Sequence, residues 1–322
     1  MSISYLSIIA VKKGINVAKK TVLILLGPTC VGKTGASLLL AKALDTEIIS
    51  ADSMQIYRYM DIGTAKPVAQ ERALVKHHMI DIVAPSEPFS TGKYVASIIP
   101  IIDELHRKEM IPLVVGGTGL YIKAMTRGIF SGPAADWELR ENLLAMEEKS
   151  SGSLYAYLQK LDREAASRIM PSDIRRIIRA LEVCLMTETG ISELQERRTV
   201  PLPYKFIKIG LTRERGELYG LIEKRIESMI SRGLVNEVKS LLLMNPGRTA
   251  LQAIGYKEIA AHLRGEYSLD EAVRLIKKRT KNYAKRQVTW FKTEPDIRWF
   301  DITGFSTHEK VQRTIALLLK ML

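Results

Sequence analysis

Short apolar runs alternate with amphipathic stretches through the first 130 residues of the chain. Four of these runs have the length and bounding residues of strands: Val22–Leu26, Glu47–Ser50, Met79–Val83 and Pro112–Val115. Between them, Gly32–Leu44 and Thr91–Met110 repeat apolar residues at helical spacing, and Pro100 predicts a kink or a division into two helices. This alternation of strands and helices predicts a parallel sheet with helices on both faces.

The segment from Ser131 to Val200 has a different pattern, with helical periodicity and no strand-like run. The helices predicted in it are Trp137–Lys149, Leu154–Leu161 and Ile174–Met186. Gly132-Pro133 precedes these helices and Pro201-Leu202-Pro203 follows them, as is typical of segment boundaries. We therefore expect an all-helical insertion between two strands of the core.

The sheet pattern resumes after the insertion. Lys205–Leu211 alternates like a strand, and Leu218–Leu243 predicts a long amphipathic helix that is broken near Arg232-Gly233. Two further helices, a strand-like Ile297–Ile302 and a terminal helix complete the pattern.

A chain of 322 residues is long enough for about two domains of roughly 150 residues each. The predicted division is a core at 21–130 and 201–322 and a helical insertion domain at 131–200. Residues 1–20 contain lysines and no acidic residue, and we interpret them as an N-terminal extension, with a transit peptide as the alternative.

The segment after the first apolar run matches G-x-x-x-x-G-K-[ST] in the required order of strand, turn and helix. It consists of Gly27, Pro28, Thr29, Cys30, Val31, Gly32, Lys33 and Thr34. Its N–H groups and the following helix N-terminus can face phosphate oxygens, Lys33 adds positive charge, and Thr34 can reach a magnesium ion. The sequence thus predicts a di- or triphosphate site in an α/β fold, a P-loop-containing parallel sheet flanked by helices, with an inserted all-helical subdomain and C-terminal helices.

Two polar residues follow other predicted strands. Asp52 ends the strand at 47–51, where a carboxylate beside a phosphate loop is suited to general-base work, although an aspartate that caps a turn is the alternative. Thr118 lies in Gly116-Gly117-Thr118-Gly119, where many P-loop enzymes have an acidic residue for Mg²⁺. A neutral donor there is suited to developing negative charge, and the alternative is a glycine-rich helix entry.

The charge balance favours a polyanionic partner. Lysine and arginine number 48 against 35 acidic residues, a formal net charge of +13. The segment Arg274–Lys292 is rich in lysine and arginine, has no acidic residue and includes Tyr283, Trp290 and Phe291, a composition typical of an RNA-contacting element. The alternative is a solvated helix face. A second cluster at Arg175, Arg176 and Arg179 is explained equally well by pairs within its helix.

Several classes of site and location are disfavoured by composition. The two cysteines, Cys30 and Cys184, have no zinc-site spacing and indicate a reducing cytoplasm, and the five histidines form no metal-binding array. No apolar run reaches the roughly 18–20 residues of a membrane span.

Taken together, the motifs resemble the bacterial-type tRNA dimethylallyltransferases, also called tRNA isopentenyltransferases, from about residue 21 to 301. The segments that carry the resemblance are Gly27–Thr34, Ser50–Tyr57, Met60–Pro67, Val115–Tyr121, Arg179–Val183, Gly255-Tyr256 and Lys285–Trp290. The run Asp61-Ile62-Gly63-Thr64-Ala65-Lys66-Pro67 is specific, since no known kinase family carries it.

The resemblance implies a definite reaction. Dimethylallyl diphosphate binds with its diphosphate on the phosphate loop, and N6 of adenosine 37 in tRNAs reading codons that start with U attacks the allylic carbon as diphosphate leaves. Asp52 is then the acceptor of the N6 hydrogen, Thr118 steadies the bridging oxygen, and Thr34 holds Mg²⁺ as cofactor. Arg225 is the candidate for an arginine near the diphosphate, although relatives often have a second arginine where this chain has Leu221.

The partner implied by the resemblance is a tRNA anticodon stem-loop, bound by a monomer in the cytoplasm. The residues implied as tRNA contacts are Asp52, Ser53, Met54, Gln55, Gly119, Arg175, Arg176, Ile177, Ile178, Arg179, Gln252, Gly255, Tyr256, Lys257, Lys285, Arg286, Gln287, Trp290 and Lys292. From the residues alone, two other functions stay open: a P-loop kinase of a small molecule or nucleotide, with ATP as donor, and a non-catalytic RNA-binding protein.

Overall fold

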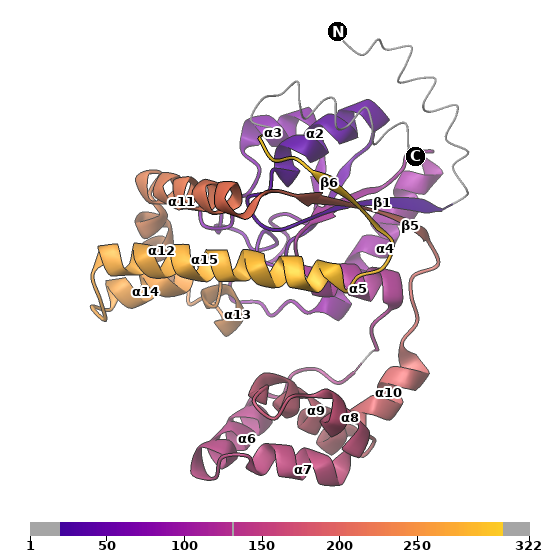
Figure 1. Ribbon diagram of the computed structural model, residues 1–322, viewed down its shortest axis with the longest axis vertical. Coiled ribbons are helices and arrows are strands. Elements are labelled where there is room, and N and C mark those ends of the chain that lie inside the picture. Colours follow the sequence, from indigo (N-terminus) through magenta and orange to yellow (C-terminus); the bar gives the residue numbers. More distant parts are fainter. Residues whose placement is uncertain (1–19, 131, 305–322) are drawn as a thin grey trace. The chain divides into compact units, whose positions relative to one another are not determined.

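The computed structural model describes residues 20–130 and 132–304, so the expected terminal helix and nearly all of the N-terminal extension lie outside the described residues. These residues form a six-stranded sheet in the order β3-β2-β4-β1-β5-β6, in which every neighbouring pair is parallel (Figure 1). The strands are β1 (Thr21–Leu26), β2 (Ile48–Ala51), β3 (His77–His78), β4 (Leu113–Gly116), β5 (Lys205–Thr212) and β6 (Ile297–Asp301). The expected α/β fold with a parallel sheet is confirmed.

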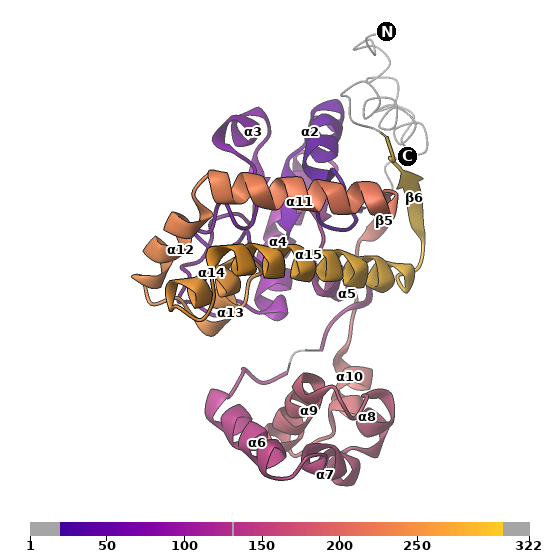
Figure 2. The same ribbon diagram turned by 60° about the vertical axis from the view of Figure 1, so that its left-hand side comes forward.

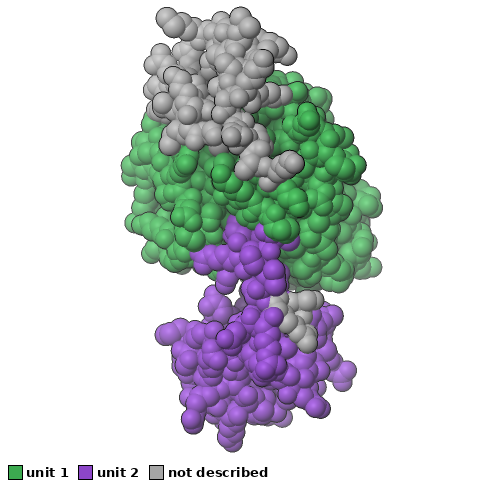
Figure 3. Space-filling model, turned by 90° about the vertical axis from the view of Figure 1, so that its right-hand side faces the viewer, with its two compact units in different colours: residues 1–122, 203–322 green, residues 123–202 purple. Residues whose placement is uncertain are grey.

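The chain divides into two compact units, residues 1–122 with 203–322, and residues 123–202 (Figure 3). The sequence pattern placed the start of the helical segment at 131, whereas this unit begins inside helix α5 (Gly119–Arg127). The last turns of α5 bury Ala124 and Met125, and the Leu202 N–H donates to the Met125 carbonyl, which joins the two ends of the helical unit.

In the sheet-containing unit, helices connect successive strands along the chain. They are α2 (Lys33–Leu44), α3 (Ala69–Leu74), α4 (Thr91–Arg107), the start of α5, α11 (Arg215–Ser231), α12 (Leu234–Leu242), α13 (Arg248–Leu251), α14 (Tyr256–Leu263) and α15 (Leu269–Lys292). The expected break of the long helix is confirmed between α11 and α12, where Gly233 has a φ of 98°. Helices α11 and α15 lie side by side (Figures 1 and 2).

Two sequence predictions are corrected in this unit. The strand expected at Met79–Val83 lies instead at His77–His78, because Met79 and Asp81 take positive φ angles that interrupt an extended backbone. The division expected at Pro100 is absent, since α4 is one helix that exposes Pro100 and buries residues such as Ile98 and Ile102.

The carboxyl ends of three adjacent strands meet at one edge of the sheet. Gly116 of β4 is in register with Leu26 of β1 on one side and with Ala51 of β2 on the other. A side chain at Gly116 would approach the Ala51 carbonyl oxygen to 2.2 Å, so glycine permits this close pairing. The phosphate loop, Asp52 and Thr118 follow these three ends directly, which is where open parallel sheets bind ligands.

The second unit is built from helices with a small core of their own. They are the end of α5, α6 (Trp137–Lys149), α7 (Ser153–Leu161), α8 (Arg163–Arg168), α9 (Ile174–Thr187) and α10 (Ile191–Arg198). The core includes Leu154, Leu158 and Leu181, all without exposed surface. Burial opposes ionisation of Glu182 in this core, but hydrogen bonds from Arg140 and Arg179 lower the pKa of its carboxyl.

Candidate active site at the carboxyl edge of the sheet

The phosphate loop has the backbone that its glycines predict. Gly27 has a φ of 152°, and a side chain there would lie 2.6 Å from the Leu211 carbonyl oxygen. Gly32, with a φ of 111°, caps α2. The Lys33 ammonium folds over the loop and donates to the carbonyl oxygens of Gly27 at 2.9 Å and Pro28 at 2.8 Å. Burial, and then the charge of Arg225, lower the pKa of Lys33 to about 8.

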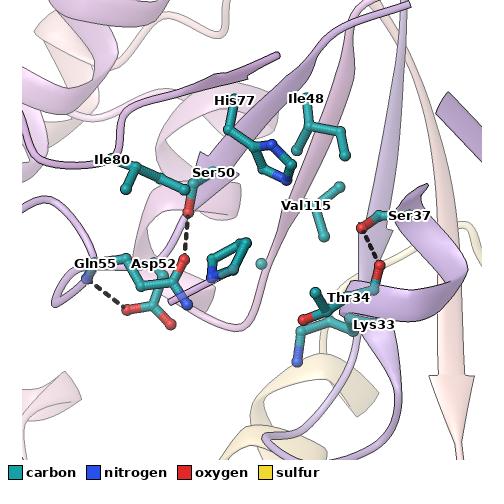
Figure 4. A pocket seen from close by; sticks show the side chains of 12 residues that line it. Lys33, Thr34, Ser37, Ile48, Ser50, Asp52, Gln55, His77, Ile80 and Val115 are labelled. Atoms are coloured by element: carbon teal, nitrogen blue, oxygen red, sulfur yellow. Dashed lines mark hydrogen bonds between the residues drawn. The ribbon is translucent and has the colours of Figure 1, made fainter. Parts of the chain in front are cut away.

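The two carboxylate oxygens of Asp52 have different surroundings. Its Oδ1 accepts from the N–H groups of Met54 at 2.9 Å and Gln55 at 3.3 Å, as in the turn-capping alternative. No group in residues 20–130 or 132–304 donates to Oδ2. Figure 4 shows Asp52 and Gln55 on one side of a cavity, with Lys33 and Thr34 on the other. The turn therefore fixes the direction of the carboxylate and leaves one oxygen for a ligand.

Thr118 is tied to the turn that carries Asp52. Its N–H donates to the Ala51 carbonyl oxygen at 3.2 Å, and its hydroxyl oxygen accepts from the Ser53 N–H at 3.1 Å. The hydroxyl hydrogen is directed at the Ser53 Oγ at 3.5 Å, a long contact that a closer acceptor could replace. The structure thus brings Asp52, Thr118 and the phosphate loop together, as expected from their positions after parallel strands.

Gln287 of α15 joins the two glycine-rich loops. Its Oε1 accepts from the Thr29 N–H at 2.8 Å, and its Nε2 donates to the Gly117 carbonyl oxygen at 2.8 Å. The side-chain amide is acceptor and donor at once, whereas a carboxylate would face the Gly117 oxygen with negative charge. Three residues later, the Trp290 ring lies so close to Gly119 that a side chain there would meet it at 2.3 Å. Helix α15 therefore sets the spacing of both loops.

Two cavities open at this edge, and Asp52 lines both of them. The smaller, about 60 Å³, is lined by Lys33, Thr34, Ser50 and Asp52 among others. The larger, about 310 Å³, extends from Thr29 and Arg225 past Asp52 towards α14 and α15. Its apolar lining includes Met54, Ala65, Ile226, Met229, Ala253, Ile254 and Ile276. A charged or phosphorylated group at one end and an apolar or aromatic group beside it would fit this arrangement.

An arginine lies beside the phosphate loop, as expected at position 225. The Arg225 guanidinium donates to the Thr29 hydroxyl at 3.4 Å and lines the larger cavity. Sequence reasoning missed a second arginine, Arg213, whose Nη2 donates to the Val31 carbonyl oxygen at 3.4 Å and which pairs with Glu217. Its signal in the sequence is its place directly after the strand at 205–212, at the same edge as the other loops.

Comparison with known proteins decides the family. The family model described as IPP transferase matches residues 55–294. The chain belongs to this family. The phosphate loop and Asp52 precede the matched region, and the Thr118 and Gln287 segments lie inside it.

Relatives with names and relatives with solved structures match nearly the whole chain. A tRNA dimethylallyltransferase of Thermodesulfovibrio yellowstonii is 57% identical over 304 residues, covering 92% of this chain and 96% of the relative. The crystal structure of a tRNA isopentenylpyrophosphate transferase from Bacillus halodurans has a TM-score of 0.69 and 39% identity, covering 94% and 98%. A eukaryotic dimethylallyltransferase solved while acting on tRNA has a TM-score of 0.76 and 29% identity, covering 94% and 79%. The family resemblance seen in the motifs is confirmed.

The residues expected to contact tRNA differ in their accessibility. Gln252, Lys257, Lys285, Arg286 and Lys292 have exposed side chains. By contrast, Tyr256, Ile177 and Gln287 are buried among protein atoms. Direct contact with tRNA therefore stays a prediction for the exposed group, whereas the buried side chains are suited to holding their neighbours in position.

The lysines and arginines of α15 fall into two groups, one in each half of the helix. In the first half, Lys277 and Lys281 pair with Glu227 at 2.7 Å and Glu223 at 2.5 Å, both on α11, and Arg279 pairs with Glu258 of α14. In the second half, Lys285, Arg286 and Lys292 have no acidic partner within the described part of the chain. The first half is therefore explained as a solvated helix face, whereas the second half is available for contact with RNA.

The arginine cluster of α9 is also partly engaged. Arg176 pairs with Asp173 at 3.3 Å, and Arg179 pairs with the buried Glu182. Arg175 is exposed and has no acidic partner among the described residues. The pairs within the helix that the sequence suggested are therefore present for two of the three arginines, and Arg175 is the member most available to an external anion.

The site offers little for thiol chemistry or for a metal ion held by protein groups alone. Cys30 is buried in the phosphate loop, and burial raises the pKa of its thiol, so it is a poor nucleophile. Across residues 20–130 and 132–304, no cluster of three histidine, cysteine or acidic residues could hold a metal ion by itself.

In the same residues no helix combines the length and the apolar character that crossing a bilayer requires.

Proposed function

We propose that this protein moves the dimethylallyl group of dimethylallyl diphosphate to N6 of adenosine 37 in tRNAs reading codons that start with U. The names of relatives that cover nearly the whole chain support tRNA prenyl transfer as the reaction class. The single structural observation that carries the residue roles is that Asp52 lines both cavities, between the Lys33 loop and the larger, partly apolar space.

The chemistry follows from these positions. The N6 amine is a weak nucleophile because its lone pair is delocalised into the purine, so orientation and stabilisation of the leaving group must lower the barrier. A bond forms from N6 to the allylic carbon, the carbon–oxygen bond breaks, and its electron pair leaves with diphosphate. Asp52 takes the N6 proton through its unbonded oxygen, and Thr118 donates to the bridging oxygen.

The donor's charged and apolar parts have separate surroundings. Lys33, Arg225 and the loop N–H groups hold the diphosphate, each preorganised donor contributing up to about 3 kcal/mol in the transition state. Ile226 and Met229, which follow Arg225 on α11 and line the larger cavity, contact the five-carbon chain. The adenine has to leave its stack to enter this space, as in other enzymes that modify bases.

Magnesium fits the site as an ion held mainly by the substrate. The smaller cavity offers the Thr34 hydroxyl and one carboxylate, Asp52, which is too few for a protein-built cage. Mg²⁺ commonly binds in this way, through few protein ligands, waters and phosphate oxygens. We assign Thr34 as its protein ligand, and the bound ion would neutralise charge on the diphosphate. We also propose that the enzyme acts as a monomer in the cytoplasm, to be tested by sedimentation and by fractionation of cells.

The proposed reaction is tested with purified protein, labelled dimethylallyl diphosphate, Mg²⁺ and unmodified tRNA carrying A36-A37. We expect label at N6 of adenosine 37 after digestion to nucleosides, and release of diphosphate. A parallel assay with γ-labelled ATP tests the kinase alternative, which phosphoryl transfer without prenyl transfer would support. Binding of tRNA without either transfer would instead favour the non-catalytic alternative.

We expect the affinity for dimethylallyl diphosphate to depend on pH through Lys33. Since its pKa is about 8 in the free protein, the ammonium is lost as pH rises through 8, and diphosphate then binds only with uptake of a proton. Affinity should therefore be constant well below pH 8 and fall by up to about tenfold per pH unit above it. Titration calorimetry measures this, and Lys33→Met controls for ionisation of the ligand. If wild type still bound the donor more tightly than Lys33→Met by the same factor at pH 9.5, the assigned ionisation of Lys33 would be wrong.

Neutralising Lys285 and Arg286 to glutamine is expected to weaken tRNA binding and flatten its dependence on salt. Each lost phosphate contact should reduce the slope of log K against log[salt] by about 0.7 to 0.9. Lys277→Gln with Lys281→Gln is the matched control, because it makes the same change in net charge at residues already paired with α11. Equal slopes for the two double variants would assign the effect to overall charge rather than to contact.

A further inference from the structure

The segment Asp61–Pro67 is one of the specific motifs of the sequence, yet the proposed reaction gives it no role. Its middle residues Gly63, Thr64 and Ala65 line the larger cavity, on the same cavity wall as Asp52 and Met54. The Thr64 hydroxyl donates to the Met60 carbonyl oxygen at 2.5 Å, so we look for the contribution of the segment in the shape and position of its backbone.

The start of the segment is bound by a carboxylate from a distant helix. In α12, Glu237 Oε2 accepts from the N–H groups of Asp61 at 3.0 Å and Ile62 at 2.7 Å, and Oε1 accepts from the Gly63 N–H at 3.0 Å. Successive backbone N–H groups that converge in this way form an anion-binding concavity. Here the protein's own carboxylate occupies it, through charge-assisted hydrogen bonds.

The same carboxylate binds a second wall of the cavity. The Tyr256 hydroxyl donates to Glu237 Oε1 at 2.5 Å, and Tyr256 follows Gly255, which lines the cavity with a φ of 98°. A side chain at Gly63 would lie 2.4 Å from the Tyr256 ring, so the segment rests directly on that ring. Burial, and then the charge of Glu237, raise the pKa of Tyr256, so its hydroxyl stays a donor.

The far end of the segment is bound from the side of Asp52. Gln55 Nε2 donates to the carbonyl oxygens of Thr64 at 3.2 Å and Ala65 at 3.3 Å, and the Gln55 N–H donates to Asp52 Oδ1. Lys66, whose side chain is 2% exposed, donates to Asp61, Asp81 and the Tyr57 carbonyl oxygen. A continuous set of hydrogen bonds thus runs from Asp52 through the segment to Glu237.

We propose that Glu237 is a positioning residue for the acceptor adenine: it holds the Gly63–Ala65 and Gly255 walls of the cavity in register with Asp52. This role rests on the proposed prenyl transfer. Glu237 does not line the cavity, whereas the donor end of the cavity is formed by Thr29 and Arg225, which Glu237 does not bond. Loss of its carboxylate should therefore disturb use of the acceptor and spare binding of the donor.

Glu237→Gln tests this with little change in side-chain volume. We expect faster hydrogen exchange at the amides of residues 61–63, kcat/KM for tRNA at least tenfold lower, and a Kd for dimethylallyl diphosphate within twofold of wild type. Glu227→Gln is the matched control, because Glu227 is an exposed acid on α11 that pairs with Lys277. It should leave all three quantities near their wild-type values.

Tyr256→Phe provides a second variant if Glu237→Gln does not fold, since it removes only the hydroxyl bond to Glu237. It should lower kcat/KM for tRNA in the same direction, and little further loss is expected when it is combined with Glu237→Gln. Unchanged exchange at residues 61–63, or an equal loss for donor and tRNA, would overturn the positioning role. If the wild-type enzyme transferred no prenyl group, the proposed function itself would be overturned. Hydrogen exchange at residues 61–63 would still test whether Glu237 holds this segment.

Discussion

Replacement of Asp52 by asparagine is expected to lower the single-turnover rate of prenyl transfer by at least about a hundredfold, the usual range for loss of a general base. Asparagine keeps an oxygen that can accept from the Met54 and Gln55 N–H groups, so the turn should survive. Affinity for tRNA should then change by less than about threefold, because the exposed basic residues of α15 are untouched. Rapid-quench kinetics and filter binding measure the two quantities.

The matched control is Asp296→Asn, at an exposed aspartate between α15 and β6 that lines neither cavity. It should have wild-type turnover. Asp52→Ala removes the turn bonds as well, and a larger loss of stability is expected for it than for Asp52→Asn. If Asp52→Asn turned over at nearly the wild-type rate, Asp52 would be a structural turn residue and the proton would have another acceptor.

Replacement of Lys33 by methionine should weaken binding of dimethylallyl diphosphate about ten- to a hundredfold, from loss of charge-assisted hydrogen bonds of roughly 1.5–3 kcal/mol. The value of kcat/KM for the donor should fall further, by about a thousandfold, because charge on the diphosphate grows as the carbon–oxygen bond breaks. The neighbouring donors, Arg225 and the loop N–H groups, do not replace an ammonium that lies over Gly27 and Pro28.

Lys42→Met is the control for this variant, since Lys42 is an exposed lysine in the last turn of the same helix, α2. Calorimetry gives the donor affinity, and initial rates at varied donor concentration give kcat/KM. A Lys33→Met enzyme that bound donor as tightly as wild type would show that the loop does not hold the diphosphate.

The sequence predicted those parts of the site that depend on local order along the chain. The phosphate loop, Asp52 and Thr118 each follow a short apolar strand, and parallel strands bring their carboxyl ends together, so their proximity could be inferred from the sequence alone. The same holds for the helical segment after Ser131 and for the helix break at Gly233, where glycine adopts a left-handed backbone.

The parts that could not be predicted depend on pairs far apart in the chain. Gln287 bonds the Thr29 N–H across 258 residues, and Glu237 bonds the Asp61 N–H across 176. Neither residue has a local pattern that distinguishes it from an ordinary polar side chain on a helix. Likewise, α15 is a basic run in sequence, but acids supplied by α11 and α14 neutralise its first half only in the folded protein.

The central claim is that the Lys33 loop holds the departing diphosphate while Asp52 directs adenine N6 to the allylic carbon. A crystal structure of the enzyme with a non-reactive thiolodiphosphate analogue of the donor and an anticodon stem-loop tests it most directly. We expect the diphosphate on residues 27–34 and N6 of adenosine 37 within about 3 Å of the free Asp52 oxygen, the distance of a hydrogen bond. An adenine bound elsewhere, or a diphosphate away from Lys33, would contradict the claim.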